Sequence, residues 1–181
     1  MAKVFATIDD ELAHWIAQQK MFFVATAPLG DEGLINCSPK GGDSFRVLNG
    51  TQVAYQDFTG SGVETIAHLR ENGRIVIMFC AFEGAPKILR LHGRGTVATA
   101  ADEGYAELIA KFPANPGTRA IIHVDVERIA DSCGYAVPVY EFKAPRDILD
   151  QWAVDKGAEG VQAYQRANNR RSIDGLPGLD A

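Results

Sequence analysis

The chain has 181 residues, of which 46% are hydrophobic, so it can bury one sizeable core but is too short for two full domains. Its net charge of −5 leaves no excess of Lys and Arg to neutralise a phosphate backbone, which argues against nucleic-acid binding. No apolar run approaches the roughly 18 residues that span a bilayer, and no basic segment precedes an apolar stretch at the N-terminus. We therefore expect a soluble, cytoplasmic protein with no membrane partner.

The N-terminal part predicts one helix followed by short strands. Asp9 or Asp10 can cap an amphipathic helix over residues 10–20, where Leu12, Trp15 and Ile16 fall at helical spacing. Runs rich in branched and aromatic residues then alternate with Gly, Pro, Asn and Asp, which is typical of antiparallel strands. The expected strands cover residues 21–27, 34–39, 44–48 and 52–58.

A second helix is expected over residues 63–72, because its apolar pattern stops at Gly73. The next segment, 74–82, is apolar at almost every position, which indicates a strand covered on both faces. A further strand is expected over 87–99, a helix over 102–112 and a last strand over 120–133.

The C-terminal quarter changes character, since from Pro145 onward it is polar and helical and ends in a Gly-rich tail. We predict a mainly β protein, in which a closed or partly closed antiparallel β-barrel over residues 1–144 carries helices at its ends. Residues 145–181 form a helical extension that packs on the barrel or on a second subunit. The lack of strict strand–helix alternation counts against a doubly wound parallel sheet.

The Thr59-Gly60-Ser61-Gly62 turn precedes the second helix and is a candidate anion site. A helix start presents unpaired N–H groups and the positive end of its dipole, and Thr59, Ser61 and Thr65 add hydroxyl donors. The turn lacks the Lys of a Walker loop and the third glycine of a dinucleotide-binding loop. The alternative is an ordinary helix whose N-cap is Ser or Thr.

A second segment, "NCSPKGGDSF", offers Ser38, Lys40 and two glycines at the end of a strand. If this strand lies beside the helix start, Lys40 supplies a cation to the same anion; otherwise residues 40–42 are a solvated hairpin turn. Arg90 is a third candidate, because a charged side chain in an apolar strand must reach either solvent or an anionic partner.

No catalytic motif of another class is present. The three cysteines form no Cys-x-x-C pair, so reduced and mostly buried thiols are expected. The four histidines are scattered without metal-ligand spacing, and no Gly-x-Ser-x-Gly elbow occurs.

The chain resembles the pyridoxamine 5′-phosphate oxidase-like, FMN-binding split-barrel proteins. The resemblance rests on "LINCSPKG", "VAYQDFTGSGVETIAHLRENGRIVIMF" and "ILRLHGRG", with weaker similarity at "SCGYAVP" and "SIDGLP". It implies a six-stranded antiparallel split barrel that forms a homodimer, with FMN bound at the subunit interface. The vitamin B6 oxidases carry a Ser-Arg-Lys type cluster at the helix start, where this chain has Val63-Glu64-Thr65, and their C-terminal ending also differs.

The resemblance also implies the cofactor-binding residues. The residues that it assigns to FMN are Ser38, Lys40, Gly41, Tyr55, Gln56, Asp57, Thr59, Ser61 and Thr65, with Arg90 on a strand that flanks the flavin ring. It implies an FMN-dependent oxidoreductase that exchanges two electrons with a small organic substrate or a reduced nicotinamide. The alternative functions are a flavin-binding or other ligand-binding protein without turnover, and protein interaction through the C-terminal helix.

Overall fold

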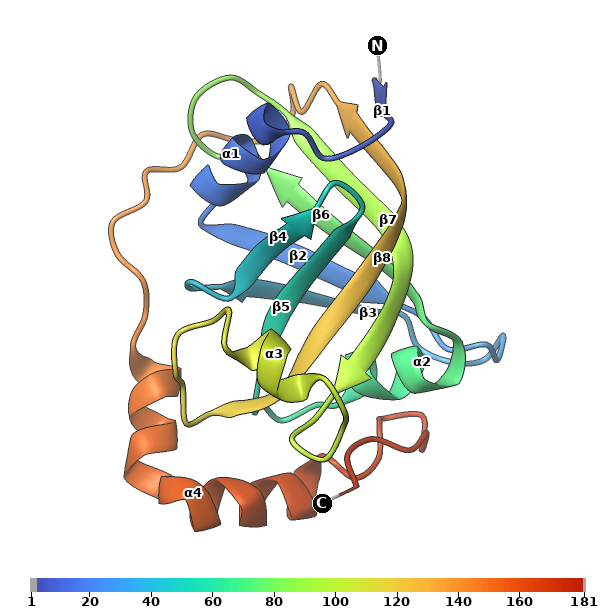
Figure 1. The fold of residues 1–181 in the computed structure, drawn as a ribbon, viewed down its shortest axis with the longest axis vertical. Coiled ribbons are helices and arrows are strands. Elements are labelled where there is room, and N and C mark those ends of the chain that lie inside the picture. Colours follow the sequence, from blue (N-terminus) through green and yellow to red (C-terminus); the bar gives the residue numbers. More distant parts are fainter. Residues whose placement is uncertain (1–2, 181) are drawn as a thin grey trace.

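The computed structural model describes residues 3–180, whose strands form one antiparallel sheet in the order β3-β2-β6-β7-β8-β5-β4, with the short β1 paired to β8. The sheet curves into a barrel that stays open between β3 and β4 (Figure 1). The strands are β1 Val4–Phe5, β2 Met21–Thr26, β3 Asn36–Gly41, β4 Phe45–Asn49, β5 Gln52–Phe58, β6 Arg74–Cys80, β7 Ile88–Ala98 and β8 Thr118–Ser132.

Alternating burial explains why these segments form strands around one core. In β2 each second residue is buried, so Phe22, Val24 and Thr26 face the barrel interior. The neighbouring β6 sends Ile75, Ile77 and Phe79 inward, and the main cluster of buried apolar side chains fills the barrel. Burying alternate apolar residues from every strand is what a small barrel requires.

Four helices lie around the barrel: α1 Asp10–Gln18, α2 Glu64–Asn72, α3 Tyr105–Ile109 and α4 Ile148–Asn168. Asp9 caps α1 by accepting a hydrogen bond from the N–H of Leu12, as expected. Gly73 ends α2 in the left-handed region at a φ of 70°, a conformation that favours glycine. Gly157 interrupts α4 with non-helical angles.

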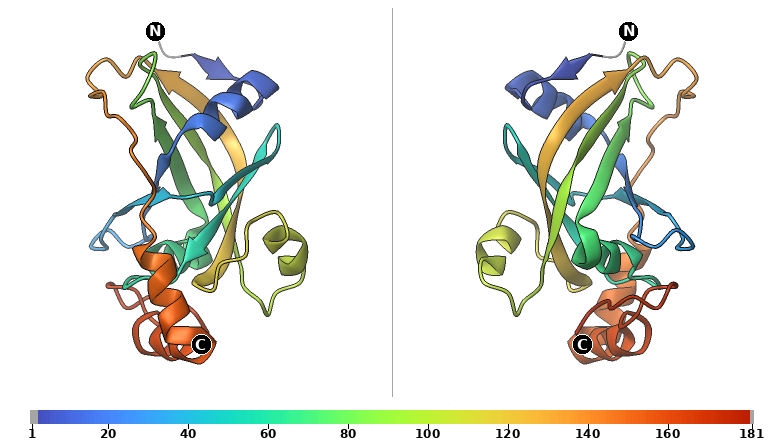
Figure 2. Two further views of the ribbon diagram at one scale, coloured as in Figure 1. Left: turned by 90° about the vertical axis from the view of Figure 1, so that its left-hand side faces the viewer. Right: turned by 90° about the vertical axis from the view of Figure 1, so that its right-hand side faces the viewer.

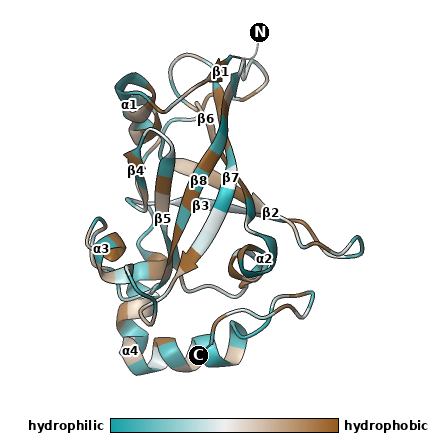
Figure 3. Ribbon diagram, turned by 45° about the vertical axis from the view of Figure 1, so that its right-hand side comes forward, coloured by the Kyte–Doolittle hydropathy of each residue, from teal (hydrophilic) through white to brown (hydrophobic). Residues whose placement is uncertain are grey.

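The helices divide between the two ends of the barrel (Figure 1). α1 covers one end, and α2 and α4 lie at the other. The segment between β8 and α4 runs in extended form along one side of the barrel from the first end to the second (Figure 2). α4 is coloured mostly hydrophilic, whereas the barrel strands alternate (Figure 3). The C-terminal extension therefore packs against the end of the barrel where α2 begins.

The structure confirms the predicted fold class and differs from it in three details. The sheet has eight strands where the resemblance implied six. α3 is shorter than the predicted 102–112, since the α-helix is confined to Tyr105–Ile109. The N-cap of α2 is Val63, which has no side-chain cap, instead of Ser or Thr. Within residues 3–180, no helix is both long and apolar enough to cross a membrane.

Candidate functional site

The turn of residues 59–62 joins the end of β5 to the start of α2. Thr59 is anchored because its N–H donates to the Gly117 carbonyl at 2.7 Å. Within residues 3–180 the N–H groups of Gly60, Ser61, Gly62 and Val63 have no hydrogen-bond acceptor. Because the first N–H groups of a helix also lack intrahelical acceptors, this end of α2 presents a group of free donors at the positive end of its dipole.

An ion triad lies next to this turn. The Asp57 carboxylate is fully buried on β5 and accepts from Lys40 Nζ at 2.7 Å and from Arg119 Nε at 2.8 Å. The Lys40 side chain is 19% exposed and that of Arg119 is 5% exposed. Burial acts most strongly on the pKa of Asp57 and raises it, but the charges and hydrogen bonds of Lys40 and Arg119 together outweigh burial and leave this pKa below its usual value. Asp57 is therefore a charged group inside the barrel.

Arg119 links the triad to the turn and to the C-terminal extension. Its Nη1 donates to the Gly62 carbonyl at 2.7 Å and to Asn169 Oδ1 at 3.1 Å. Asn169 in turn donates to the Gly60 carbonyl at 2.9 Å, and Gln165 donates to Thr59 Oγ1 at 2.8 Å. The end of α4 and Arg119 thus hold the turn from one side.

A second set of polar side chains links β3 to the core. Asn36 Nδ2 donates to Thr65 Oγ1 at 3.0 Å, and Ser38 Oγ donates to Asn36 Oδ1 at 3.0 Å. Thr26 Oγ1 lies 3.0 Å from Nδ1 of the fully buried His68. Burial lowers the pKa of His68, so its neutral form is favoured. β3 is therefore attached to α2 through neutral hydrogen bonds.

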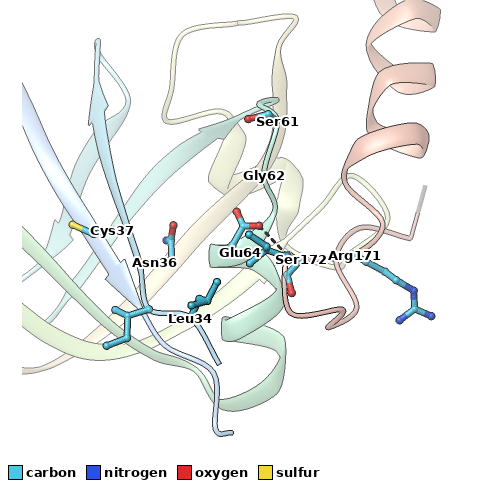
Figure 4. Close-up of a pocket in the computed structure, with 10 residues that line it drawn as sticks. Leu34, Asn36, Cys37, Ser61, Gly62, Glu64, Arg171 and Ser172 are labelled. Atoms are coloured by element: carbon cyan, nitrogen blue, oxygen red, sulfur yellow. Dashed lines mark hydrogen bonds between the residues drawn. The ribbon is translucent and has the colours of Figure 1, made fainter. Parts of the chain in front are cut away.

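A pocket of about 640 Å³ opens beside the turn and the start of α2. Figure 4 shows Glu64 at the start of α2, between β3 and the C-terminal tail. Glu64 Oε1 accepts from the N–H of Ile173 at 3.2 Å, while Arg171 points away from Glu64 and donates to the Gly175 carbonyl at 2.8 Å. The residues that line the pocket are Leu34, Ile35, Asn36, Cys37, Ser61, Gly62, Glu64, Arg171, Ser172 and Ile173.

The match with a known family covers most of the barrel. The family model described as pyridoxamine 5′-phosphate oxidase matches residues 8–133. The pyridoxamine 5′-phosphate oxidase family protein ustO of Aspergillus flavus is 37% identical over an alignment 194 residues long, which covers 97% of this chain and 77% of that protein. The chain belongs to the pyridoxamine 5′-phosphate oxidase family.

Solved structures share this fold. HupZ of Group A Streptococcus is 25% identical, with a TM-score of 0.52 over 67% of this chain and 91% of that one. A pyridoxamine 5′-phosphate oxidase-related, FMN binding protein of Nostoc punctiforme is 14% identical, with a TM-score of 0.54 over 74% of this chain and 87% of that one. Residues 134–180 lie beyond the matched family model, yet they supply Arg171, Ser172 and Ile173 to the pocket.

The structure brings most of the residues predicted for this family's site to one end of the barrel. Thr59 and Ser61 are in the turn and Thr65 is in the first turn of α2. Lys40 reaches Asp57, and Ser38 reaches Asn36 two residues before it on β3.

Four other residues that were predicted to bind the cofactor make contacts away from the turn or are buried in the core. Gln56 is buried on the opposite face of β5 from Asp57 and donates to Thr118 Oγ1. Tyr55 is fully buried in the core, where burial, with the charge of Asp57 next, raises its pKa well above the usual value. Arg90 donates to Ser132 Oγ, and the Gly41 carbonyl accepts from Ser44 Oγ.

The sequence prediction did not include Arg119, Gln165 or Asn169. Arg119 lies 62 residues from Asp57 in the chain, and Asn169 lies 109 residues from Gly60. Arg119 immediately precedes the expected last strand, but nothing in its neighbourhood identifies its partner. Within residues 3–180, no group of three or more His, Cys, Asp or Glu side chains could hold a metal ion.

Proposed function

We propose that this protein binds FMN, with the phosphate at the 59–62 turn and the start of α2, and acts as an FMN-dependent oxidoreductase. The observation that carries the proposal is the group of free N–H donors opening beside a pocket of about 640 Å³. Pockets for small molecules and cofactors commonly measure about 300–1,000 Å³. Membership of the pyridoxamine 5′-phosphate oxidase family supports a phosphate-bearing cofactor at this position.

The residues at the turn fit a phosphate group. Ser61 is exposed and adds a hydroxyl donor to the backbone N–H groups, and a Cβ placed on Gly60 would meet no atom within 4 Å, so a ligand can approach the backbone there. Lys40 uses one of its donors on Asp57 and keeps others. Backbone N–H groups at a helix start with hydroxyls beside them are a common phosphate-binding arrangement.

The cofactor supplies the two-electron chemistry when it is bound, and the chain supplies binding and orientation. Ser61 and the N–H groups of the turn would hold the phosphate. Leu34, Ile35 and Ile173 add apolar surface at the pocket. These exposed apolar side chains suit a flat organic group better than water. The substrate that we propose is a small organic molecule or a reduced nicotinamide.

An absorbance spectrum of the purified protein from about 300 to 600 nm, with FMN added if the protein is colourless, tests the binding proposal. We expect two flavin bands that follow the protein through gel filtration. The variant Ser61→Ala should bind FMN more weakly, whereas Thr51→Ala should not, because Thr51 is an exposed hydroxyl residue just before β5, at the opposite end of that strand from Phe58 and the turn. A protein that fails to bind added FMN would refute the proposal.

A flavin-binding or other ligand-binding protein without turnover is the second candidate function. The Glu64 carboxylate in the pocket favours it, because a negative charge disfavours an anionic substrate there. Anaerobic mixing of the FMN-loaded protein with a reduced nicotinamide and with small organic reductants separates the two functions. Bleaching of the flavin absorbance supports the enzyme, and an unchanged spectrum with every reductant supports the binding protein.

We also propose that the protein is a homodimer with the cofactor site at the subunit interface. The outward side chains Phe23, Val76 and Met78 on β2 and β6 are only half-buried. Large exposed apolar side chains also occur in the segment before α4, at Tyr135, Val139, Tyr140 and Phe142, and at the first two residues of α4, Ile148 and Leu149. Contiguous exposed apolar surface is typical of an interface. Light scattering at micromolar protein should give the mass of a dimer, and the mass of a monomer would contradict the proposal.

We propose a cytoplasmic location. The three cysteines Cys37, Cys80 and Cys133 are all free thiols. Free cysteines without disulfides suit a reducing compartment. Fractionation of the producing cells tests this location, and recovery of the protein outside the cytoplasm would contradict it.

A further inference from the structure

Asn169 is a fully buried amide at the end of α4, outside the part of the chain that the family model matches. Its Nδ2 donates to the Gly60 carbonyl at 2.9 Å and its Oδ1 accepts from Arg119 Nη1 at 3.1 Å. Its backbone is also fixed, because its N–H donates to the Gln165 carbonyl and its carbonyl accepts from the N–H of Leu179. The side chain is therefore held in one orientation.

The contacts of Asn169 require an amide. The Gly60 carbonyl needs a donor, whereas the Arg119 guanidinium needs an acceptor, and one planar amide supplies both. A carboxylate at this position could accept from Arg119 but could not donate to Gly60. An apolar side chain would leave both buried partners without this bond.

These contacts decide where the N–H groups of the turn point. The C=O and N–H of a trans peptide unit point in opposite directions, and no cis peptide occurs within residues 3–180. Asn169 holds the Gly60 carbonyl, so the N–H of Ser61 points away from Asn169. Arg119 holds the Gly62 carbonyl, so the N–H of Val63 points away from Arg119. Both carbonyls are therefore held on the side of Asn169 and Arg119, and the N–H groups of Ser61 and Val63 point to the opposite side of the turn.

We propose that Asn169 is a positioning residue for the cofactor phosphate: it orients the donors of the 59–62 turn from the C-terminal extension without touching the cofactor. This inference rests on the proposed function, because the phosphate is the anion that those donors would bind. It also assigns the extension a part in the cofactor site. Gln165 supports the same arrangement through its bond to Thr59 Oγ1.

The test compares FMN with riboflavin, which has the same ring and side chain but no phosphate. Dissociation constants for both are measured by flavin fluorescence with the full-length protein and with Asn169→Ala. We expect Asn169→Ala to weaken FMN binding about tenfold or more, the effect of losing one well-placed hydrogen bond to a charged group, while riboflavin binding changes little. A purely structural role would weaken both ligands alike.

The control is Asn168→Ala, because Asn168 is an exposed residue of the same type whose Nδ2 donates to the Tyr164 carbonyl of its own helix. It should leave both affinities unchanged. If Asn169→Ala does not fold, Asn169→Leu replaces it, since this variant nearly keeps the size of the side chain, removes both hydrogen bonds and adds no charge. It should show the same selective loss of FMN.

The outcomes separate the two proposals. If the unmodified protein binds FMN no better than riboflavin, no phosphate is held at the turn, and both the FMN assignment and the role of Asn169 are wrong. If it prefers FMN and the folded Asn169 variant keeps that preference, the role of Asn169 alone is wrong. Equal weakening of both ligands by the variant also overturns the positioning role.

Discussion

Removing the buried carboxylate of Asp57 should destabilise the protein much more than removing a carboxylate from a surface ion pair. In Asp57→Ala, Arg119 stays in the interior without its counter-ion, while Lys40 can turn toward solvent because its side chain is 19% exposed. Breaking a buried pair on one side costs about 3–5 kcal/mol. Arg119 keeps its bonds to Gly62 and Asn169, so we expect the lower end, about 3 kcal/mol.

The assay is urea unfolding without added FMN, followed by tryptophan fluorescence at one fixed protein concentration, since a dimer would make stability depend on concentration. The matched control is Asp43→Ala, whose carboxylate is 71% exposed and pairs with Arg46 on the surface. Surface pairs contribute up to about 1 kcal/mol. A loss in Asp57→Ala no larger than that in Asp43→Ala would refute the assignment of a buried charged triad.

The pH dependence gives a second measurement of the same triad. The pKa of Asp57 is lower in the folded protein than the value of about 3.9 expected in the unfolded chain. Its stabilising contribution is therefore fully present above that unfolded value and is lost as the pH falls through the lower folded value. The stability difference between the unmodified protein and Asp57→Asn should shrink below about pH 4. A difference that stays constant from about pH 7 to pH 3 would contradict a charged Asp57.

Two further substitutions test the interface and the backbone of the sheet. Phe23→Lys places a charge on the outward face of β2 and should convert the proposed dimer to a monomer by light scattering, while an unchanged dimer mass would exclude this face from the interface. Gly93→Ala should lower the free energy of unfolding by about 1–3 kcal/mol, because its Cβ would clash with the backbone carbonyl of Asp125. Gly60→Ala, whose Cβ would meet nothing within 4 Å, should leave stability within about 0.5 kcal/mol, and equal losses in both would contradict the packing argument.

Local patterns were sufficient for the fold because each element has its own signal in the sequence. The alternation of β2, the cap at Asp9 and the glycine that ends α2 at Gly73 act within a few residues of one another, and the structure confirms all three. The alternative of a Ser or Thr N-cap for α2 was wrong: the N-cap is Val63, and Thr59 Oγ1 accepts from Gln165, which comes from α4. A local rule cannot foresee a partner from a distant helix.

The candidate site was harder to predict than the fold, because its contacts join distant parts of the chain. Asp57 was predicted, but its buried partner Arg119 comes from β8 and the pairing depends on strand register. The position of Gln56, which was also predicted to bind the cofactor, depends on strand geometry. Neighbouring residues of a strand point to opposite faces, so Gln56 and Asp57 cannot both reach the turn's side of β5. Nothing in the sequence marked Asn169 as a site residue, because an Asn at the end of a polar helix is ordinarily solvated.

The charges around the turn explain why hydrogen bonds, more than net charge, must hold an anion there. Lys40 and Arg119 together carry one more positive charge than Asp57. Glu64, which lines the pocket at the start of α2, offsets that excess. With the formal charges balanced, affinity for a phosphate depends on how well the N–H groups and Ser61 are oriented, because preorganised donors lose little on binding. Arg119 bonds to Asp57, to the turn and to Asn169 at once, so one of the two residues that keep Asp57 charged also fixes the direction of those donors.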